Sequence, residues 1–501
     1  MRGKTACYNA ISSLTLELVS IICGFVLPRV VLSAFGSTYN GLLTSITQFL
    51  SAVTLLRAGV GGVTRAALYN HLAKNDVDRI SAIVVATKRF MQKIAYIFAI
   101  GLLVFAFIYP FLVIESFDFF FTCTLVLIMG IATFVQYYFA ITYQMLLIAD
   151  QRQYVITIIQ SITLVLNLIV SVALIFLGCD IHVVKFGSAA VYCLNPLLTV
   201  FYVERKYRIN KYVEPDNTAL SQRWDAFAHQ IAAYVQENTD VMVLTVFSTV
   251  AEVSVYSVYF LIVNGIKKLL SALTAGIESI FGNMIALGEQ DGLRRNMIRI
   301  EYLVFSVGAV AYSCLFILIV PFVSIYTAGI TDAEYARPLF ALLLTASQFI
   351  CCIRTPYQNL VDAAGHFKQT RNSAIIEASL NLIVSIVTVI PFGLIGVAIG
   401  TLLSSLYRTI YLAIYASKNI LKRSNYCFIK RVICGLLEMG VIYILASALF
   451  DMTVSGYASW LIYAIIIGIL SVAVVLVASL IFDRKDFRDC FKKAISMLKL
   501  G

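Results

Sequence analysis

Charged residues are scarce in this sequence. Asp, Glu, Lys and Arg together make up 13% of its 501 residues, whereas hydrophobic residues make up 60%. An average soluble domain contains about 25% charged residues. The shortage of charge therefore excludes an ordinary soluble globular protein and places the chain in the membrane class.

Metal-binding patterns and catalytic motifs are also missing. The four histidines lie far apart, and the 11 cysteines include the adjacent pair Cys351 and Cys352 but no C-x-x-C pair. Metal sites and disulfide frameworks require closer or patterned ligands. The sequence contains no Walker A or H-E-x-x-H motif. We therefore expect no metal, no cofactor and no enzymatic activity.

Long hydrophobic runs are what the sequence does have. A helix needs about 20 apolar residues to cross the hydrocarbon core. The run after Asn9 lacks a small-residue cleavage pattern, so we interpret it as the first membrane helix and not as a signal peptide. Fourteen spans are predicted, at about 10–34, 40–64, 94–114, 119–148, 154–177, 187–203, 225–248, 254–287, 300–320, 338–361, 373–390, 394–415, 432–450 and 460–482.

The basic residues indicate the orientation of these spans. With the N-terminus in the cytoplasm, 30 of the 38 Lys and Arg residues fall in cytoplasmic segments, and only Lys185 and Arg337 fall in external loops. This asymmetry follows the positive-inside rule and predicts that both termini are cytoplasmic. The net charge of +11 therefore reflects membrane topology, and we expect no nucleic-acid partner.

Two segments outside the spans have an amphipathic pattern. We expect residues 65–93 to form one helix lying in the membrane interface. The tail Asp483–Gly501 carries an apolar stripe formed by Phe487, Phe491, Ile495 and Leu498. Both segments fit basic amphipathic helices that contact membrane lipids, and a surface for docking a partner is the alternative.

An internal repeat divides the chain into two halves. LNLIVS occurs at Leu166–Ser171 and again 214 residues later at Leu380–Ser385, and Tyr143-Gln144 recurs in the same register at Tyr357-Gln358. The two copies of the repeat are six spans apart. Because six is an even number, both copies have the same orientation in the membrane. The repeat therefore predicts two parallel six-helix bundles, which suit alternating access. The predicted division is an N-lobe at 1–203, a cytoplasmic linker at 204–224, a C-lobe at 225–415, two added spans at 416–482 and a cytoplasmic tail at 483–501.

Six basic residues lie within the predicted spans, where a charge costs roughly 2.5–3.5 kcal/mol on insertion scales. We predict that they bind an anionic substrate in a hydrated central cavity, and they are Arg29, Arg57, Lys267, Lys268, Arg354 and Arg408. Lys267 and Lys268 lie on a polar helical stripe deep in a span, which favours contact with an anion. Internal ion pairs or snorkelling to the membrane surface are the alternatives for the set.

Acidic and amide residues also occur within spans. Glu237 and Asp240 are three residues apart on one predicted helix, so their carboxylates are neighbours. They could couple transport to H⁺ or Na⁺, or they could neutralise Lys267 and Lys268, and both interpretations stay open. Side chains expected to form hydrogen bonds between helices are Gln136, Asn167 and Asn381.

The sequence resembles bacterial polysaccharide flippases of the Wzx type. The resemblance rests on the fourteen spans, the repeat, the run FGSTYNGLLTSITQFLSAVTLLRAGVGG at Phe35–Gly62 and the following LYNHLAKNDVDRI. These flippases belong to a superfamily that also contains lipid II flippases and multidrug and toxin extruders. The resemblance implies an all-α fold with two lobes in a bacterial plasma membrane.

The resemblance also implies a function. Relatives move an undecaprenyl-pyrophosphate-linked oligosaccharide to the outer leaflet, and basic residues on their first, second and eighth helices meet the pyrophosphate. By helix, Arg29, Arg57 and the pair Lys267 and Lys268 match that pattern, and a polysaccharide polymerase is an implied partner. The alternatives are a lipid II flippase, a multidrug exporter of the same fold and, less favoured, a membrane glycan polymerase.

Overall fold

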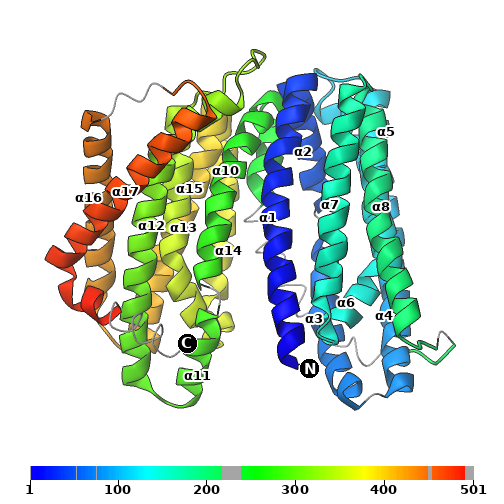
Figure 1. The fold of residues 1–501 in the computed structure, drawn as a ribbon, viewed down its shortest axis with the longest axis horizontal. Coiled ribbons are helices and arrows are strands. Elements are labelled where there is room, and N and C mark those ends of the chain that lie inside the picture. Colours follow the sequence, from blue (N-terminus) through cyan, green and yellow to red (C-terminus); the bar gives the residue numbers. More distant parts are fainter. Residues whose placement is uncertain are drawn as a thin grey trace. The chain divides into compact units, whose positions relative to one another are not determined.

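The computed structural model describes residues 2–51, 54–74, 76–210, 212–216, 238–274, 276–449 and 454–490. All regular secondary structure in these ranges is helical (Figure 1). Twelve of the described helices are long and apolar enough to cross a membrane. The predicted class, an all-α polytopic membrane protein, is confirmed.

The chain forms two compact units, unit 1 at Met1–Ser254 and unit 2 at Val255–Gly501. Unit 1 contains α1 (Arg2–Phe35), α2 (Ser37–Ser51), α3 (Thr54–Lys74), α4 (Val77–Leu112), α5 (Phe119–Val135), η1 (Gln136–Ala140), α6 (Ile141–Ala149), α7 (Gln153–Phe176), α8 (Ile181–Lys206) and the short helix Asn238–Phe247. The domain boundaries inferred from the repeat stay predictions.

Unit 2 contains most of α10 (Val250–Thr274), whose first turn belongs to unit 1. It continues with α11 (Ile277–Ala286), α12 (Gln290–Tyr326), α13 (Pro338–Ala363), α14 (Phe367–Phe392), α15 (Leu394–Tyr415), η3 (Ala416–Ile420), α16 (Tyr426–Leu449) and α17 (Tyr457–Phe482). Within it, α15 packs against α13 and α14, and α12 packs against α13, α16 and α17.

Eleven of the fourteen predicted spans correspond to one long apolar helix or to a continuous series such as α5–η1–α6. The predicted span at 254–287 is divided between α10 and α11, so Lys267 and Lys268 lie near the end of α10 and not deep within one continuous span. The predicted span at 40–64 is likewise divided between α2 and α3. Most of the predicted span at 225–248 lies outside the described residues, and its described end forms the helix Asn238–Phe247.

Two sequence-based expectations about loops are wrong. Residues 65–93 are not one interfacial helix, because they contain the end of α3 and the beginning of α4. Ile80, Ile83 and Val84 from this region are buried in a core cluster of unit 1. Lys185 does not lie in an external loop, because α8 begins at Ile181 and includes it.

Small residues allow close helix packing inside unit 1. A Cβ atom on Gly41 of α2 would overlap the backbone carbonyl of Val250. Beside this contact, Asn40 Nδ2 donates to Ser254 Oγ at 2.8 Å, and the Ser45 and Thr245 hydroxyls share a hydrogen bond of 2.7 Å. Close approach at small residues, with polar side chains joining the helices, is typical of membrane helix packing.

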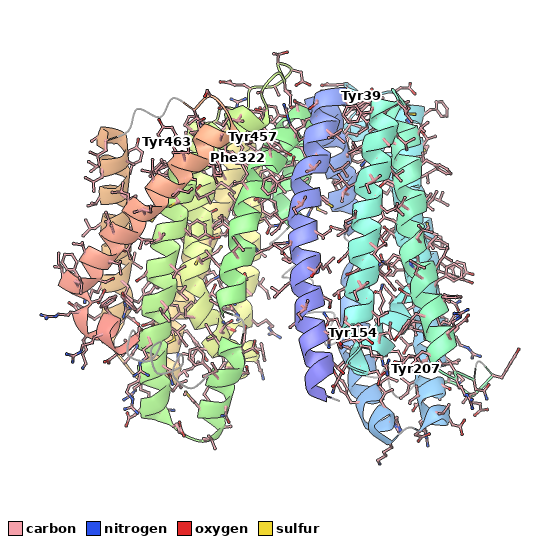
Figure 2. The ribbon with its side chains drawn as sticks, in the orientation of Figure 1. Tyr39, Tyr154, Tyr207, Phe322, Tyr457 and Tyr463 are labelled. Atoms are coloured by element: carbon pink, nitrogen blue, oxygen red, sulfur yellow. The ribbon has the colours of Figure 1, made fainter. Side chains whose placement is uncertain are left out.

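Aromatic residues mark the ends of the helices. In unit 1, Tyr39 lies near one end of the bundle, and Tyr154 and Tyr207 lie near the other (Figure 2). In unit 2, Phe322 near the end of α12 packs against Trp460 of α17 with ring centroids 4.9 Å apart. Tyrosine and tryptophan prefer the two membrane–water interfaces. Their distribution in unit 1 therefore fits helices that cross a bilayer.

Candidate functional site

The predicted basic residues fall into two groups. Arg29 on α1 and Lys267 and Lys268 on α10 are half-buried. Arg57 belongs to α3, but its side chain lies outside the described residues. The role of these four residues in substrate binding stays a prediction.

Arg354 and Arg408 are brought together by one carboxylate in unit 2. Glu377 on α14 accepts from Arg354 of α13 at 2.5 Å, and its second oxygen lies 3.6 Å from Nε of Arg408 on α15. The Glu377 side chain is only 4% exposed. Arg408 also donates to the backbone carbonyl of Thr370 at 3.0 Å and to the Ser373 hydroxyl. We call Arg354, Glu377 and Arg408 the unit-2 ion cluster.

The ion pairs of the unit-2 ion cluster contribute to the stability of unit 2. Removing one partner of a buried ion pair is strongly destabilising, because it leaves a charge without compensation. Two guanidinium groups share one carboxylate, so the cluster keeps a net positive charge. The pairing gives both arginines a structural role, and substrate contact by either one stays a prediction.

The predicted coupling residues are only partly described. Asp240 in the helix Asn238–Phe247 is buried, with 7% of its surface exposed. Glu237 lies outside the described residues. Coupling to H⁺ or Na⁺ through this pair therefore stays a prediction.

Unit 1 contains a polar cavity that the sequence did not predict. Its volume is about 690 Å³, within the range of small-molecule sites. We call it the unit-1 cavity. Polar side chains from α1, α2, α5, η1, α7 and α8 line it, and they are Glu17, Ser20, Thr47, Ser51, Thr133, Gln136, Tyr137, Gln160, Thr163, Asn167, Lys185, Ser188, Tyr192 and Asn195.

One hydrogen bond joins polar side chains of two helices in this wall. Asn167 Nδ2 donates to the Tyr192 hydroxyl at 3.3 Å, which confirms the hydrogen bond between helices expected for Asn167. Asn195 is 9% exposed, and its Oδ1 has no hydrogen-bond partner in the described part of the chain. The cavity can therefore offer both donors and acceptors to a bound molecule.

The expectation for Asn381 is also confirmed. Its Nδ2 atom donates across to α15, to Thr401 Oγ1 at 3.2 Å and to Ser404 Oγ at 3.5 Å. Asn381 is the repeat partner of Asn167. The six-residue identity thus places one asparagine at the interface of two consecutive helices in each unit.

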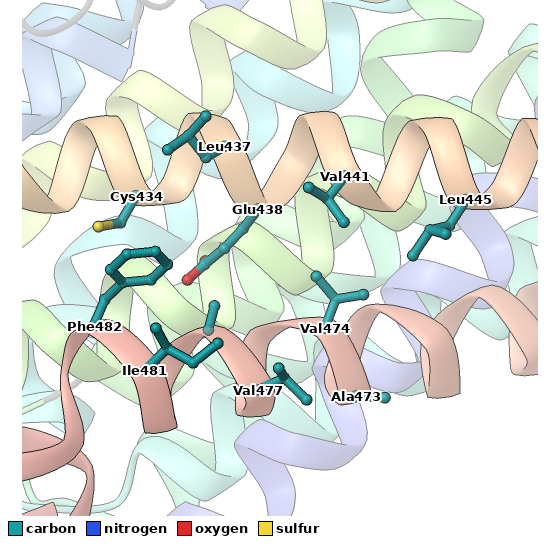
Figure 3. Close-up of a pocket in the computed structure, with 11 residues that line it drawn as sticks. Cys434, Leu437, Glu438, Val441, Leu445, Ala473, Val474, Val477, Ile481 and Phe482 are labelled. Carbon is teal, nitrogen blue, oxygen red and sulfur yellow. The ribbon is translucent and has the colours of Figure 1, made fainter.

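A second, mainly apolar pocket lies between α16 and α17, outside the repeat. Its volume is about 380 Å³. The Glu438 side chain points from α16 toward α17, among Cys434, Val477 and Phe482 (Figure 3). A carboxyl group on an otherwise apolar helix pair is costly in a membrane. Glu438 lies within the predicted span at 432–450.

No protein-family model matches the sequence, and no curated protein matches it. Solved structures do resemble its fold. A lipid II flippase MurJ in an inward closed conformation has a TM-score of 0.72 at 15% identity, over 95% of this chain and 98% of that one. The structure establishes the same helical fold, and at this identity the likeness extends to the fold alone.

Two multidrug transporters resemble the chain over a smaller share of its length. An inward-facing MATE family transporter of the MOP superfamily has a TM-score of 0.57 at 12% identity, covering 82% of this chain and 98% of that one. The Vibrio cholerae MATE transporter VcmN has a TM-score of 0.55 at 14% identity, covering 85% and 99%. These three structures are all of transporters.

Proposed function

We propose that the protein moves an undecaprenyl-pyrophosphate-linked oligosaccharide from the cytoplasmic to the outer leaflet of a bacterial plasma membrane. The observation that carries this proposal is the adjacent pair Lys267 and Lys268, half-buried on the candidate span α10, in a chain with a flippase-like fold. Two ammonium groups at such a position suit an anionic head group that cannot cross hydrocarbon unaided.

The chemistry of each step follows from charge and solvation. Lys267 and Lys268, together with Arg29 and Arg57, would replace the water lost by the pyrophosphate. Phosphate oxygens accept strong hydrogen bonds from such cations. The lipid tail would stay in the bilayer while the head group crosses by alternating access, so no covalent bond is made or broken. Released repeat units would then serve a polysaccharide polymerase.

The anion contact is tested by removing both charges. Lys267→Ala with Lys268→Ala should stop export of the surface glycan while leaving the amount of membrane-inserted protein unchanged. The matched control is Arg484→Ala with Lys485→Ala, which removes an adjacent, exposed basic pair after α17. Normal export by the lysine double variant would reject the proposed anion contact.

Coupling to an ion gradient is tested separately. If Glu237 and Asp240 carry a coupling H⁺ or Na⁺, transport into vesicles should depend on that gradient in the wild type and lose this dependence in Glu237→Gln. An unchanged gradient dependence in the variant would remove Glu237 from the coupling mechanism.

The proposed orientation, with both termini in the cytoplasm, can be tested at Arg337. This residue lies just before α13 in the longest predicted external loop. A cysteine introduced by Arg337→Cys should react with a membrane-impermeant reagent added from outside. Reaction only from the cytoplasmic side would overturn the orientation.

A lipid II flippase is the second candidate function. The likeness to MurJ favours it, because its TM-score of 0.72 exceeds the 0.57 and 0.55 of the two multidrug transporters. Both candidates move a polyprenyl pyrophosphate and would use the same cations. Expression in cells depleted of their own lipid II flippase separates the two, because only a lipid II flippase should restore growth.

A further inference from the structure

Lys185 is the basic residue among the described residues that line the unit-1 cavity. It lies in the second turn of α8 and lines the cavity wall. It makes neither a hydrogen bond nor an ion pair with any residue that the structure describes. An ammonium group inside a membrane bundle is costly unless it faces water or an anion. Its position therefore favours an anionic ligand.

The other walls of the unit-1 cavity suit a molecule rich in hydroxyl groups. Gln160 brings both an amide donor and an amide acceptor to the cavity wall, and Asn195 lines the wall with a carboxamide whose Oδ1 atom is buried. The Tyr192 hydroxyl and Asn167 amide form a further polar surface. A hydroxyl group can both donate and accept a hydrogen bond, and an amide side chain has a donor nitrogen and an acceptor oxygen. Such groups on several helices can therefore bind several hydroxyls of one ligand.

The charge balance of the cavity restricts the anion. Glu17 on α1 lines the same cavity as Lys185. With one carboxylate and one ammonium, a ligand carrying a single negative charge is better tolerated than a doubly charged phosphate, because like charges repel strongly at low dielectric constant. A sugar carboxylate meets both requirements, since it is a single negative charge on a hydroxyl-rich ring.

We propose that the unit-1 cavity binds an acidic sugar of the transported glycan, with the Lys185 ammonium contacting its carboxylate. The proposal deepens the function proposed above and rests on it for the source of the sugar. It assigns the sugar portion of the substrate to unit 1 and leaves the pyrophosphate to the lysines of α10.

The first test measures binding of simple probes to the full-length protein in lipid nanodiscs. Ligand-observed NMR should detect glucuronate binding more strongly than glucose binding, and inorganic phosphate should compete poorly. Equal binding of glucose and glucuronate would overturn the proposal. Competition by phosphate as strong as that by unlabelled glucuronate would also overturn it, because the cavity would then be a general anion site.

Variants of Lys185 test whether glucuronate binds at this residue. Lys185→Gln should weaken glucuronate binding by roughly tenfold, the loss expected for one charged hydrogen bond, and leave glucose binding unchanged. Lys185→Arg should keep most of the affinity for glucuronate. The matched control is Lys206→Gln, which removes the same charge from the exposed end of α8. An unchanged affinity in Lys185→Gln would overturn the proposal.

A second variant covers the case in which Lys185→Gln does not fold. Ser188→Asp adds a negative charge to the cavity wall one helical turn from Lys185. It should weaken glucuronate binding and spare glucose binding. Glucuronate binding as strong as in the wild type would count against the proposed position of the carboxylate and overturn the assignment.

Flipping assays separate this inference from the proposed function. Proteoliposomes would receive two polyprenyl-pyrophosphate disaccharides, one containing glucuronate and one containing only glucose. Lys185→Gln should slow movement of the acidic disaccharide alone. If it slows neither, the sugar site is wrong and the flippase function stands. If the wild type moves neither, while glucuronate binding still depends on Lys185, the flippase function is wrong and the acidic-sugar site stands.

Discussion

The two units have different side chains at corresponding positions of the repeat. Glu377 and Asn381 on α14 correspond to Thr163 and Asn167 on α7, 214 residues earlier. Because α8 and α15 begin 213 residues apart, Arg408 corresponds to Asn195. Unit 2 thus has a closed ion cluster where unit 1 has shorter, neutral side chains that line a cavity of about 690 Å³.

The difference shows that the same helix arrangement can hold either a packed ion cluster or a cavity at corresponding positions. In unit 2, long charged side chains form ion pairs with one another and so connect three helices. In unit 1, Thr163 and Asn195 are too short to meet across the same space, so the polar groups face a cavity. We expect the first arrangement to serve stability and the second to serve ligand binding.

The largest effect is expected from Glu377→Gln. It leaves the Arg354 and Arg408 guanidinium groups without their shared counter-charge, which should lower the free energy of unfolding by about 3–5 kcal/mol. Thermal unfolding in detergent would measure it. The repeat-matched control, Thr163→Val, removes only a hydrogen bond to Ile159 within its own helix and should cost about 1 kcal/mol. Equal losses in both variants would contradict the comparison.

A smaller loss is expected when the whole ion cluster is exchanged for its unit-1 counterparts. Glu377→Thr combined with Arg354→Ala and Arg408→Asn removes the buried charges together. The triple variant should be more stable than Glu377→Gln alone, because no guanidinium is left unpaired. Thermal unfolding in detergent compares the two variants. A triple variant less stable than Glu377→Gln would show that packing, and not charge, determines the stability of the site.

The two repeat-related asparagines should differ less. Asn381 is 1% exposed and bonds to Thr401 and Ser404, so Asn381→Ala should cost about 1–2 kcal/mol. Asn167→Ala should cost about half as much, because water entering the polar unit-1 cavity can replace the lost hydrogen bonds to Tyr192 and Ser171. Unfolding temperatures of the two variants, compared side by side, would test this order.

The smallest effect concerns the starts of α8 and α15. The side chain of Asp180 caps α8, whereas α15 begins at Leu394 after the N-cap residue Gly393, which supplies no side-chain cap. Hydrogen bonding from the His182 backbone N–H, ahead of other causes, lowers the pKa of Asp180. Its stabilising contribution is therefore present above the ordinary pKa of aspartate and is lost as pH falls through the lowered value. Asp180→Ala should cost about 1 kcal/mol near neutral pH and nothing in strong acid.

Hydropathy and charge were sufficient to predict the membrane class and most spans, because each depends on residue type along a single helix. They did not predict that span two is divided, since its apolar pattern continues through the region between α2 and α3. They also placed Lys185 outside the membrane, because a single lysine near the end of a span resembles a loop residue.

The contents of the site were harder to predict than the fold. Arg354 and Arg408 were identified as charges within spans, and Glu377 lies in the predicted span at 373–390. These three residues lie on three helices, and sequence spacing does not report contacts between helices. The unit-1 cavity was missed for the opposite reason, since it results from short side chains. The difference between Thr163 and Glu377, once the repeat aligned them, was the signal that could have indicated it.

The segment after α17 is held by charge, and this matters for shortening the chain. Asp483 accepts from Lys430 at 2.8 Å, and Asp486 accepts from Arg431, whose side chain is 5% exposed, at 2.7 Å. Asp483 also lies 3.8 Å from the Arg431 guanidinium. Truncation directly after Phe482 would therefore remove both carboxylates from this buried guanidinium and destabilise α16. A deletion meant to probe the tail should therefore begin beyond Asp486, or misfolding would be mistaken for loss of the tail's own activity.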